Sequence, residues 1–115
     1  MRIAIVGSRN YPRLDLVVEF VVLLPEGTVV GSGDACGVDQ MAVSAAKACG
    51  LKTVEHLADW ALHGRAAGMI RNRVMLDDVD EVVAFWNRKS RGTLNMIEIT
   101  KRAGKRVTVI EPPLA

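Results

Sequence analysis

The strongest constraint on the fold is an alternation between short, almost wholly apolar segments and longer segments of helical character. The apolar segments are rich in β-branched residues, and strands that are apolar on both sides must be covered on both sides. Expected strands span 2–6, 27–31, 51–57, 81–86 and 106–110, and expected helices span 12–24, 38–49, 65–76 and 93–103. This order predicts an α/β fold with a doubly wound, five-stranded parallel sheet, order 3-2-1-4-5, and helices on both faces.

The bulk properties fit one folded domain over residues 1–115. Half of the residues are apolar and 24% are charged, and no linker, repeat or low-complexity segment divides the chain. The net charge of +2 is too small to indicate a nucleic-acid partner by itself. The longest apolar run, 17–24, is too short for a membrane span, which needs roughly 20 residues. We therefore expect no membrane partner.

The two cysteines and the N-terminus predict the cellular setting. Neither Cys36 nor Cys49 has partner histidines at metal-ligand spacing, so no metal site is expected. Cys49 lies among alanines in a helix and is expected to be a small buried side chain. The first residues run directly into an apolar strand and lack the features of a signal peptide. A reduced, cytoplasmic protein is the expectation.

A glycine-rich loop joins the second expected strand to the helix at 38–49. Its glycines are Gly31, Gly33 and Gly37, with Ser32 and Asp34 between them. Such a loop brings the backbone close to a ligand, and the helix that follows presents unpaired N–H groups and a positive dipole end. Together these features are typical of a phosphate site. The alternative is a tight strand-to-helix turn without a ligand, because glycine-rich turns of this kind are common.

Three loops are expected to meet at one edge of the sheet. Ligands of open parallel sheets bind beyond the carboxyl ends of the strands, where the strand order reverses. The loops that fall there are 7–11, 31–37 and 87–93, which are polar, glycine-rich and basic. Their convergence favours a ligand site over the simpler explanation that loops are polar.

Seven blocks of the sequence together resemble one known superfamily: 7–9, 32–42, 58–60, 64, 67–75, 83–86 and 90–93. These blocks resemble the SLOG superfamily, which includes the Lonely Guy phosphoribohydrolases and the DNA-uptake protein DprA. The small YspA-like branch is the most similar. The resemblance implies a Rossmann-like domain that binds, as a sensor or processor, a nucleotide or a nucleotide-derived phosphate ligand. No cofactor is implied.

The resemblance places Arg71 at a ligand-facing position. Position 73 lies about 200° round the helix from position 71, so at most one of the two arginines faces the pocket. Arg71 is therefore expected to be the anion clamp, and Arg73 to lie on a solvated face. Arg9, directly after the first strand, is the second expected phosphate ligand.

Other residues of the expected site have two roles open to them. Asp39, in the first turn of its helix, can stabilise the helix dipole or contact a ligand ribose. Ser90 and Thr93 can cap the next helix or hold phosphate oxygens. The resemblance favours phosphate, because it places this turn opposite the first glycine loop. The complete set of expected ligand- or phosphate-binding residues is Gly7, Ser8, Arg9, Gly31, Ser32, Gly33, Asp34, Gly37, Asp39, Arg71, Asn72, Ser90, Gly92 and Thr93.

Aromatic, histidine and surface residues leave further alternatives. Tyr11 and Trp86 can stack on a base or pack in the core. His56 and His63 have no carboxylate or nucleophile partner at recognisable spacing, and no role is assigned to them. The apolar residues at 66–70 suit a homo-oligomer interface or an ordinary core face.

Catalysis and DNA binding are the alternatives to a binding module. Lonely Guy proteins carry the motif P-G-G-x-G-T-x-x-E and hydrolyse the N-glycosidic bond of nucleoside 5′-monophosphates. Here Gly92 and Thr93 keep the Gly-Thr pair, but Met96 stands at the glutamate position and Glu98 should face away from the pocket. No catalytic residue is assigned for this reason. DprA-like binding of single-stranded DNA is weaker still, because aromatic residues make up only 4% of the chain.

Overall fold

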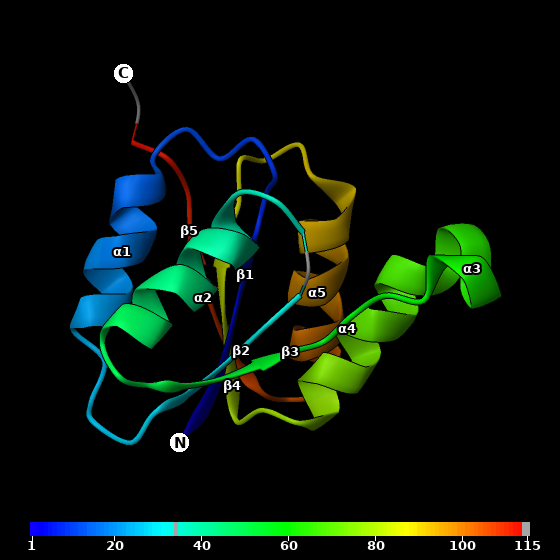
Figure 1. The fold of residues 1–115 in the computed structure, drawn as a ribbon. Helices are drawn as coiled ribbons and strands as arrows, with labels where there is room; N and C mark the ends of the chain where they lie inside the picture. Colours follow the sequence, from blue (N-terminus) through cyan, green and yellow to red (C-terminus); the bar gives the residue numbers. More distant parts are fainter. Residues whose placement is uncertain (34, 114–115) are drawn as a thin grey trace.

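A computed structural model describes residues 1–33 and 35–113. Five parallel strands form one sheet in the order β3-β2-β1-β4-β5 (Figure 1), which confirms the predicted class and strand order. The strands are β1 (Arg2–Gly7), β2 (Val29–Ser32), β3 (Lys52–Glu55), β4 (Glu81–Phe85) and β5 (Arg106–Ile110). The helices are α1 (Leu14–Val22), α2 (Val38–Ala48), α3 (Trp60–His63), α4 (Ala67–Asp77) and α5 (Arg91–Arg102), with a 3-10 turn η1 (Gly64–Ala66).

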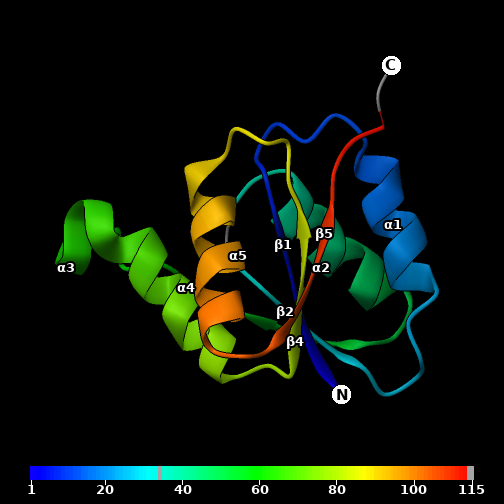
Figure 2. The ribbon, with the colours of Figure 1, turned by 180° about the vertical axis from the view of Figure 1, so that it is seen from behind.

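Helices cover both faces of the sheet, and each face has its own apolar core. Helices α1 and α2 lie on one side, whereas α4 and α5 lie on the other, as the opposite views of Figures 1 and 2 show. Along β1, Ile3 and Ile5 belong to the first core, and Ala4 and Val6 to the second. This alternation follows from the two-residue period of a strand, and it explains why the strands are apolar throughout.

The ends of several helices differ from the sequence-based expectation. Helix α1 begins at Leu14 rather than at position 12 and ends at Val22, because the chain turns there ahead of Pro25. Residues 60–63, expected to be irregular, form α3, and the Asp59 carboxylate caps it by accepting a hydrogen bond from the Leu62 N–H at 3.0 Å. The expected helix at 65–76 accordingly divides into η1 and α4.

The prediction that Cys49 is buried is wrong. Cys49 is the C-cap of α2 and is exposed, as is Cys36 in the loop before that helix. The buried face of α2 is formed instead by Val38, Ala42, Ala45 and Ala46. Position 49 follows position 45 by one turn, but it is the residue at which the helix ends.

The sheet places its carboxyl ends, and the loops that follow them, along one edge. Strand β1 lies in the centre and pairs with β2 and β4, so the loops after these three strands are neighbours. Helix α3 stands away from the sheet at the far end of α4 in both ribbon views. None of the described helices is both long and apolar enough to cross a membrane.

Candidate functional site

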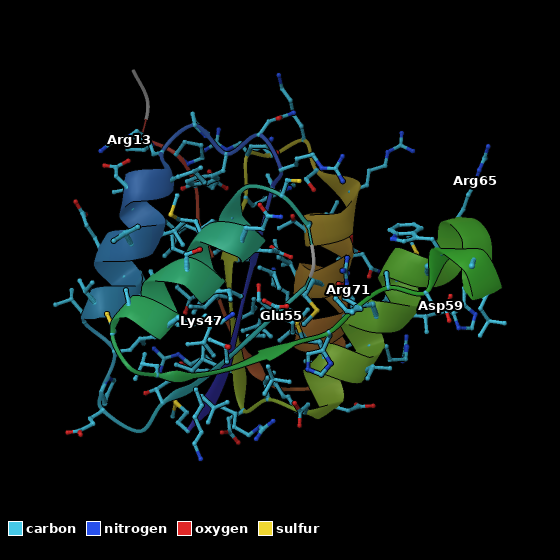
Figure 3. All side chains as sticks on the ribbon, viewed as in Figure 1. Arg13, Lys47, Glu55, Asp59, Arg65 and Arg71 are labelled. Atoms are coloured by element: carbon cyan, nitrogen blue, oxygen red, sulfur yellow. The ribbon has the colours of Figure 1, made fainter. Side chains whose placement is uncertain are left out.

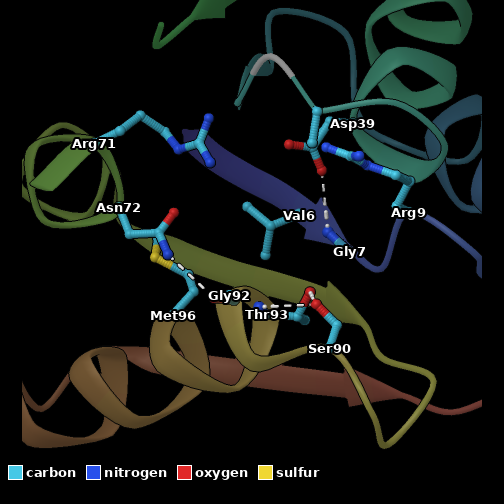
Figure 4. A pocket seen from close by; sticks show the side chains of 11 residues that line it. Val6, Gly7, Arg9, Asp39, Arg71, Asn72, Ser90, Gly92, Thr93 and Met96 are labelled. Atoms are coloured by element: carbon cyan, nitrogen blue, oxygen red, sulfur yellow. Dashed lines mark hydrogen bonds between the residues drawn. The ribbon is translucent and has the colours of Figure 1, made fainter. Parts of the chain in front are cut away.

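A cavity of about 150 Å³ opens at the carboxyl ends of β1, β2 and β4. Figure 4 shows side chains that reach it from four directions: from the end of β1, from α2, from α4 and from the start of α5. The expected site residues that line it are Gly7, Arg9, Asp39, Arg71, Asn72, Ser90, Gly92 and Thr93, and they are joined by Val6, Ala35 and Met96.

The Asp39 carboxylate ties α2 to the end of β1. Its Oδ1 accepts a hydrogen bond from the Gly7 backbone N–H at 3.1 Å, and the residue is only 4% exposed. The N–H of Gly7, one of the expected ligand-binding residues, therefore has a protein partner. Asp39 also places a negative charge in the cavity wall, which the neighbouring guanidinium groups of Arg9 and Arg71 offset.

The start of α5 forms the opposite wall. Ser90 is the N-cap: its hydroxyl accepts a hydrogen bond from the Thr93 N–H at 3.3 Å and shares another with the Thr93 hydroxyl at 3.0 Å. Asn87 fixes the preceding turn by accepting hydrogen bonds from the N–H groups of Lys89 and Ser90, each at 2.9 Å. The first N–H groups of a helix have no partner within the helix, so this end suits an anion.

Asn72 holds α4 against this helix start. Its amide nitrogen donates to the Gly92 carbonyl at 3.1 Å and to Asn95 Oδ1 at 3.2 Å, and the side chain is buried. Asn72 therefore connects α4 to the start of α5, and this contact fixes the position of the adjacent Arg71.

Two arginines face each other across the cavity. Arg71 reaches in from α4 and Arg9 from the loop after β1, and Figure 4 shows them on opposite sides. Arg73 is exposed on another face of α4. Gly33 lies close to the side chains of Asp39 and Arg71. A Cβ at this position would come within 2.7 Å of Asp39 Oδ2 and 2.8 Å of Arg71 Nη1. Any side chain at position 33 would therefore displace Asp39 or Arg71.

The other expected site residues lie behind the cavity rather than on its surface. Ser8 is fully buried, its N–H bonded to the Phe85 carbonyl at 3.0 Å and its hydroxyl accepting from the Asn87 N–H at 3.0 Å. Ser32 is likewise buried and donates to the Ile5 carbonyl at 2.8 Å. Gly31 is paired within β2, and Gly37 packs against the Arg9 backbone with a φ of +81°. Asp34 lies outside the described residues.

Two aromatic residues with alternative roles have structural partners. Tyr11 is 4% exposed, packs edge-on against Phe85 and donates its hydroxyl to the Ile110 carbonyl at 3.1 Å. Burial raises the pKa of this phenol. The Trp86 indole N–H donates to the Ser90 carbonyl at 3.1 Å, which fixes the turn before α5. Neither ring lines the cavity described above.

A second cavity of about 350 Å³ adjoins the first. The two share Arg9, Ala35, Arg71, Asn72 and Gly92, and the second extends outward to Trp60, Arg65 and Met69. Sequence reasoning did not assign these three residues to the site. Asp59 before Trp60 was the one local signal, because aspartate is a preferred N-cap and a short helix there turns the indole ring toward α4.

His56, to which the sequence assigned no role, has a carboxylate neighbour that is distant in the sequence. His56 Nε2 lies 3.3 Å from Asp78 Oδ2, and the same oxygen accepts a hydrogen bond from the Arg2 guanidinium at 2.7 Å. The hydrogen bond from Arg2 holds the pKa of the Asp78 carboxyl below its ordinary value of 3.8. These residues join β1, the end of β3 and the end of α4, which is a structural role away from the cavity.

The expected self-association face divides in two. Ala67 is buried, whereas Met69 and Ile70 are 56% and 39% exposed. For metal binding, no three His, Cys, Asp or Glu side chains among residues 1–33 and 35–113 lie close enough to share an ion.

Comparison with known proteins identifies the fold. No family model matches the chain, and no curated protein matches it in sequence. The structure of DNA processing protein A (DprA) from Streptococcus pneumoniae matches with a TM-score of 0.84 and 21% identity, over 98% of this chain and 51% of that protein. TM1055 matches with a TM-score of 0.76 and 22% identity, over 92% and 71% of the two chains.

A second DprA, from Helicobacter pylori, was solved for its single-stranded DNA binding mode. It matches with a TM-score of 0.74 and 19% identity, over 99% of this chain and 66% of that one. The present chain spans about half the length of the Streptococcus pneumoniae protein. It has the Rossmann-like fold of DprA and TM1055.

Proposed function

We propose that this protein is a binding module for a nucleotide or a nucleotide-derived phosphate ligand, as a member of the small YspA-like branch. The observation that carries the proposal is the placement of Arg9 and Arg71 on opposite sides of a cavity at the start of α5. Two guanidinium groups and a helix start supply charge-assisted hydrogen bonds to one anion, each worth roughly 1.5–3 kcal/mol.

The location of the cavity supports the same conclusion. It lies beyond the carboxyl ends of the central strands, and the strand order reverses between β1 and β4. In open parallel sheets this is where ligands bind. The buried Asn72 and the capped start of α5 hold the site in place, so little ordering is needed when a ligand arrives.

Hydrolysis of a nucleoside 5′-monophosphate is the second candidate function. Met96 lines the cavity and is fully buried, so the position that carries a glutamate in the Lonely Guy motif faces the site and holds a thioether. Asp39 is the one carboxylate among the described residues that line it, and it already accepts the Gly7 N–H. Loss of a positioned acid, base or charge stabiliser typically costs 10²–10⁴-fold in rate. Binding without efficient turnover is the reading these residues favour.

Single-stranded DNA is the third candidate, and the likeness to DprA is what raises it. The exposed cations Arg9, Arg65 and Lys89 near the site would contact one or two phosphates. Salt distinguishes the two kinds of ligand, because each neutralised phosphate of a single strand adds about 0.7 to the slope of log K against log salt. A small-ligand site predicts a shallow slope, whereas a strand bound along the surface predicts a steep one.

Calorimetric titration with inorganic phosphate, ribose 5-phosphate and the nucleoside 5′-monophosphates tests the proposal. Arg71→Ala should weaken any measured affinity by roughly 10- to 100-fold, the equivalent of one charge-assisted contact. Arg73→Ala is the matched control, because it removes the same charge from an exposed position of the same helix. Equal affinities for wild type and Arg71→Ala would place the anion site elsewhere.

A further inference from the structure

We infer that the cavity beside Trp60 is a nucleobase subsite, and that the indole ring of Trp60 is the surface on which the base stacks. This inference rests on the proposed function and specifies it: the ligand carries an aromatic base one ribose away from its phosphate. Trp60 belongs to α3, which stands away from the sheet and leaves the ring 56% exposed.

The sizes of the two cavities suggest that each holds a different part of the ligand. The inner cavity, about 150 Å³, is smaller than the roughly 300–1,000 Å³ typical of small-molecule sites. It suits a phosphate or a phosphoribosyl group but leaves no room for a base. The outer cavity, about 350 Å³, adjoins it, and Arg71 and Gly92 line both. A nucleoside monophosphate held by its phosphate inside would extend its base into this outer cavity.

The chemistry of the outer cavity suits a flat aromatic ring. A methyl group at position 68 would lie 3.5 Å from Trp60 Cη2 and 3.8 Å from Arg71 Nη2, so the indole ring and the guanidinium lie over the same spot on α4. Met69 adds a polarisable thioether from that helix, and it is 56% exposed. Indole, thioether and guanidinium groups all pack favourably on the π face of a base.

Cationic side chains line the outer cavity beside Trp60. Arg65 projects from the region of α3 (Figure 3), and Arg71 reaches into the inner cavity (Figure 4). Trp60 lines the outer cavity together with these two cations, and Arg71 also lines the inner cavity that receives the phosphate. Aromatic side chains beside clustered cations are the usual pairing of groups in sites for nucleotides and single strands.

The test compares ligands that differ only in the base. Wild-type protein is titrated with AMP, GMP, CMP, UMP and ribose 5-phosphate by calorimetry. At least one monophosphate should bind roughly 10- to 100-fold more tightly than ribose 5-phosphate, which is the range expected for one stacked base. Trp60→Ala should remove this difference and leave the affinity for ribose 5-phosphate unchanged. Trp60→Phe should restore most of it.

Leu62→Ala is the matched control. Leu62 lies on the same short helix, is 72% exposed and does not line the cavity, so its loss should alter no affinity. Fluorescence gives an independent readout, because stacking on Trp60 should quench its emission. In Trp60→Phe the quenching should disappear although Trp86 remains.

The outcomes separate the subsite from the proposed function. If ribose 5-phosphate and the monophosphates bind with equal affinity, or if Trp60→Ala keeps the preference for the base, the subsite is wrong while the anion site stands. If none of the phosphates binds, both fail. If Trp60→Ala leaves binding unchanged but alters the sedimentation coefficient, the exposed ring belongs to a contact between two copies of the chain, and the inference is overturned.

Discussion

Asp39 Oδ1 accepts a hydrogen bond from the Gly7 N–H at 3.1 Å, and this contact joins the first turn of α2 to the end of the central strand. The first two loops of the site therefore hold each other in place before any ligand binds. A carboxylate by itself repels an anionic ligand. The role of Asp39 is explained by the Gly7 N–H, which would otherwise lack this hydrogen-bond partner.

Replacement of Asp39 separates its hydrogen bond from its charge. Asp39→Ala leaves the Gly7 N–H without its partner and should lower the free energy of unfolding by about 1–3 kcal/mol. Asp39→Asn keeps an oxygen acceptor at the same place and should lower it by less. Urea unfolding of the two variants and wild type measures the difference. If Asp39→Asn lowers the free energy of unfolding as much as Asp39→Ala does, the charge rather than the acceptor is what stabilises the loop.

Gly33→Ala tests the close approach of the backbone to the site. The added methyl group would come within 2.8 Å of both Asp39 Oδ2 and Arg71 Nη1, so one of these side chains must move. Affinity for ribose 5-phosphate should fall by about tenfold, the equivalent of 1.4 kcal/mol. Gly31→Ala is the control two residues earlier, because its methyl group would make an ordinary contact with Val79. Unchanged affinity in Gly33→Ala would show that Arg71 is not positioned from this side.

The sheet and its loops were predictable because their signals are local. Apolar β-branched runs mark the strands, and the parallel order then brings the ends of β1, β2 and β4 together. Helical geometry predicted that only one of Arg71 and Arg73 faces the pocket, and the family resemblance selected Arg71. In contrast, the burial of Ser8 and its bond to the Asn87 N–H depend on residues 79 positions apart, so the sequence made Ser8 look like a loop ligand.

Three features of the structure were not predicted from the sequence, because they depend on where helices end or on which elements are neighbours in space. Cys49 is exposed at the C-cap of α2, and the sequence did not predict that the helix ends at Ala48. The pairing of His56 with Asp78 joins the ends of two elements that no sequence spacing relates. Trp60 reaches the outer cavity because a four-residue helix, capped by Asp59, interrupts what looked like an irregular connection.

Asp78→Asn should make stability less dependent on pH in acid. The pKa of Asp78 is lowered from 3.8 in the folded protein, so its carboxylate stabilises the fold above pH 3.8 and loses this effect as the pH falls through the folded-state pKa. The pair with Arg2 is partly exposed, so the loss at pH 7 should be at most about 1 kcal/mol. Unfolding at pH 7 and below pH 3.8 measures it, with the exposed Asp77→Asn as control. A difference that persists at low pH would contradict the assignment.

Incubation with each nucleoside 5′-monophosphate should release no free base at an enzymatic rate. Met96 faces the cavity where a glutamate would stabilise the developing cationic sugar, and Glu98 is exposed and lies 3.8 Å from Arg102 instead. Chromatography of the products measures the rate. Turnover of about one per second, within the common range for enzymes, would show that another group such as Asp39 performs the chemistry.

Amide chemical shifts test directly whether a phosphate-bearing nucleotide binds between Arg9, Arg71 and the start of α5. Two-dimensional ¹H–¹⁵N spectra recorded during titration with the tightest-binding monophosphate should show the largest shifts at Gly7, Arg9, Gly92 and Thr93. Ribose 5-phosphate should move the same amides, and sodium chloride at equal ionic strength should not. Shifts concentrated around His56 and Val74, on the other side of α4, or an absence of saturable shifts, would contradict it.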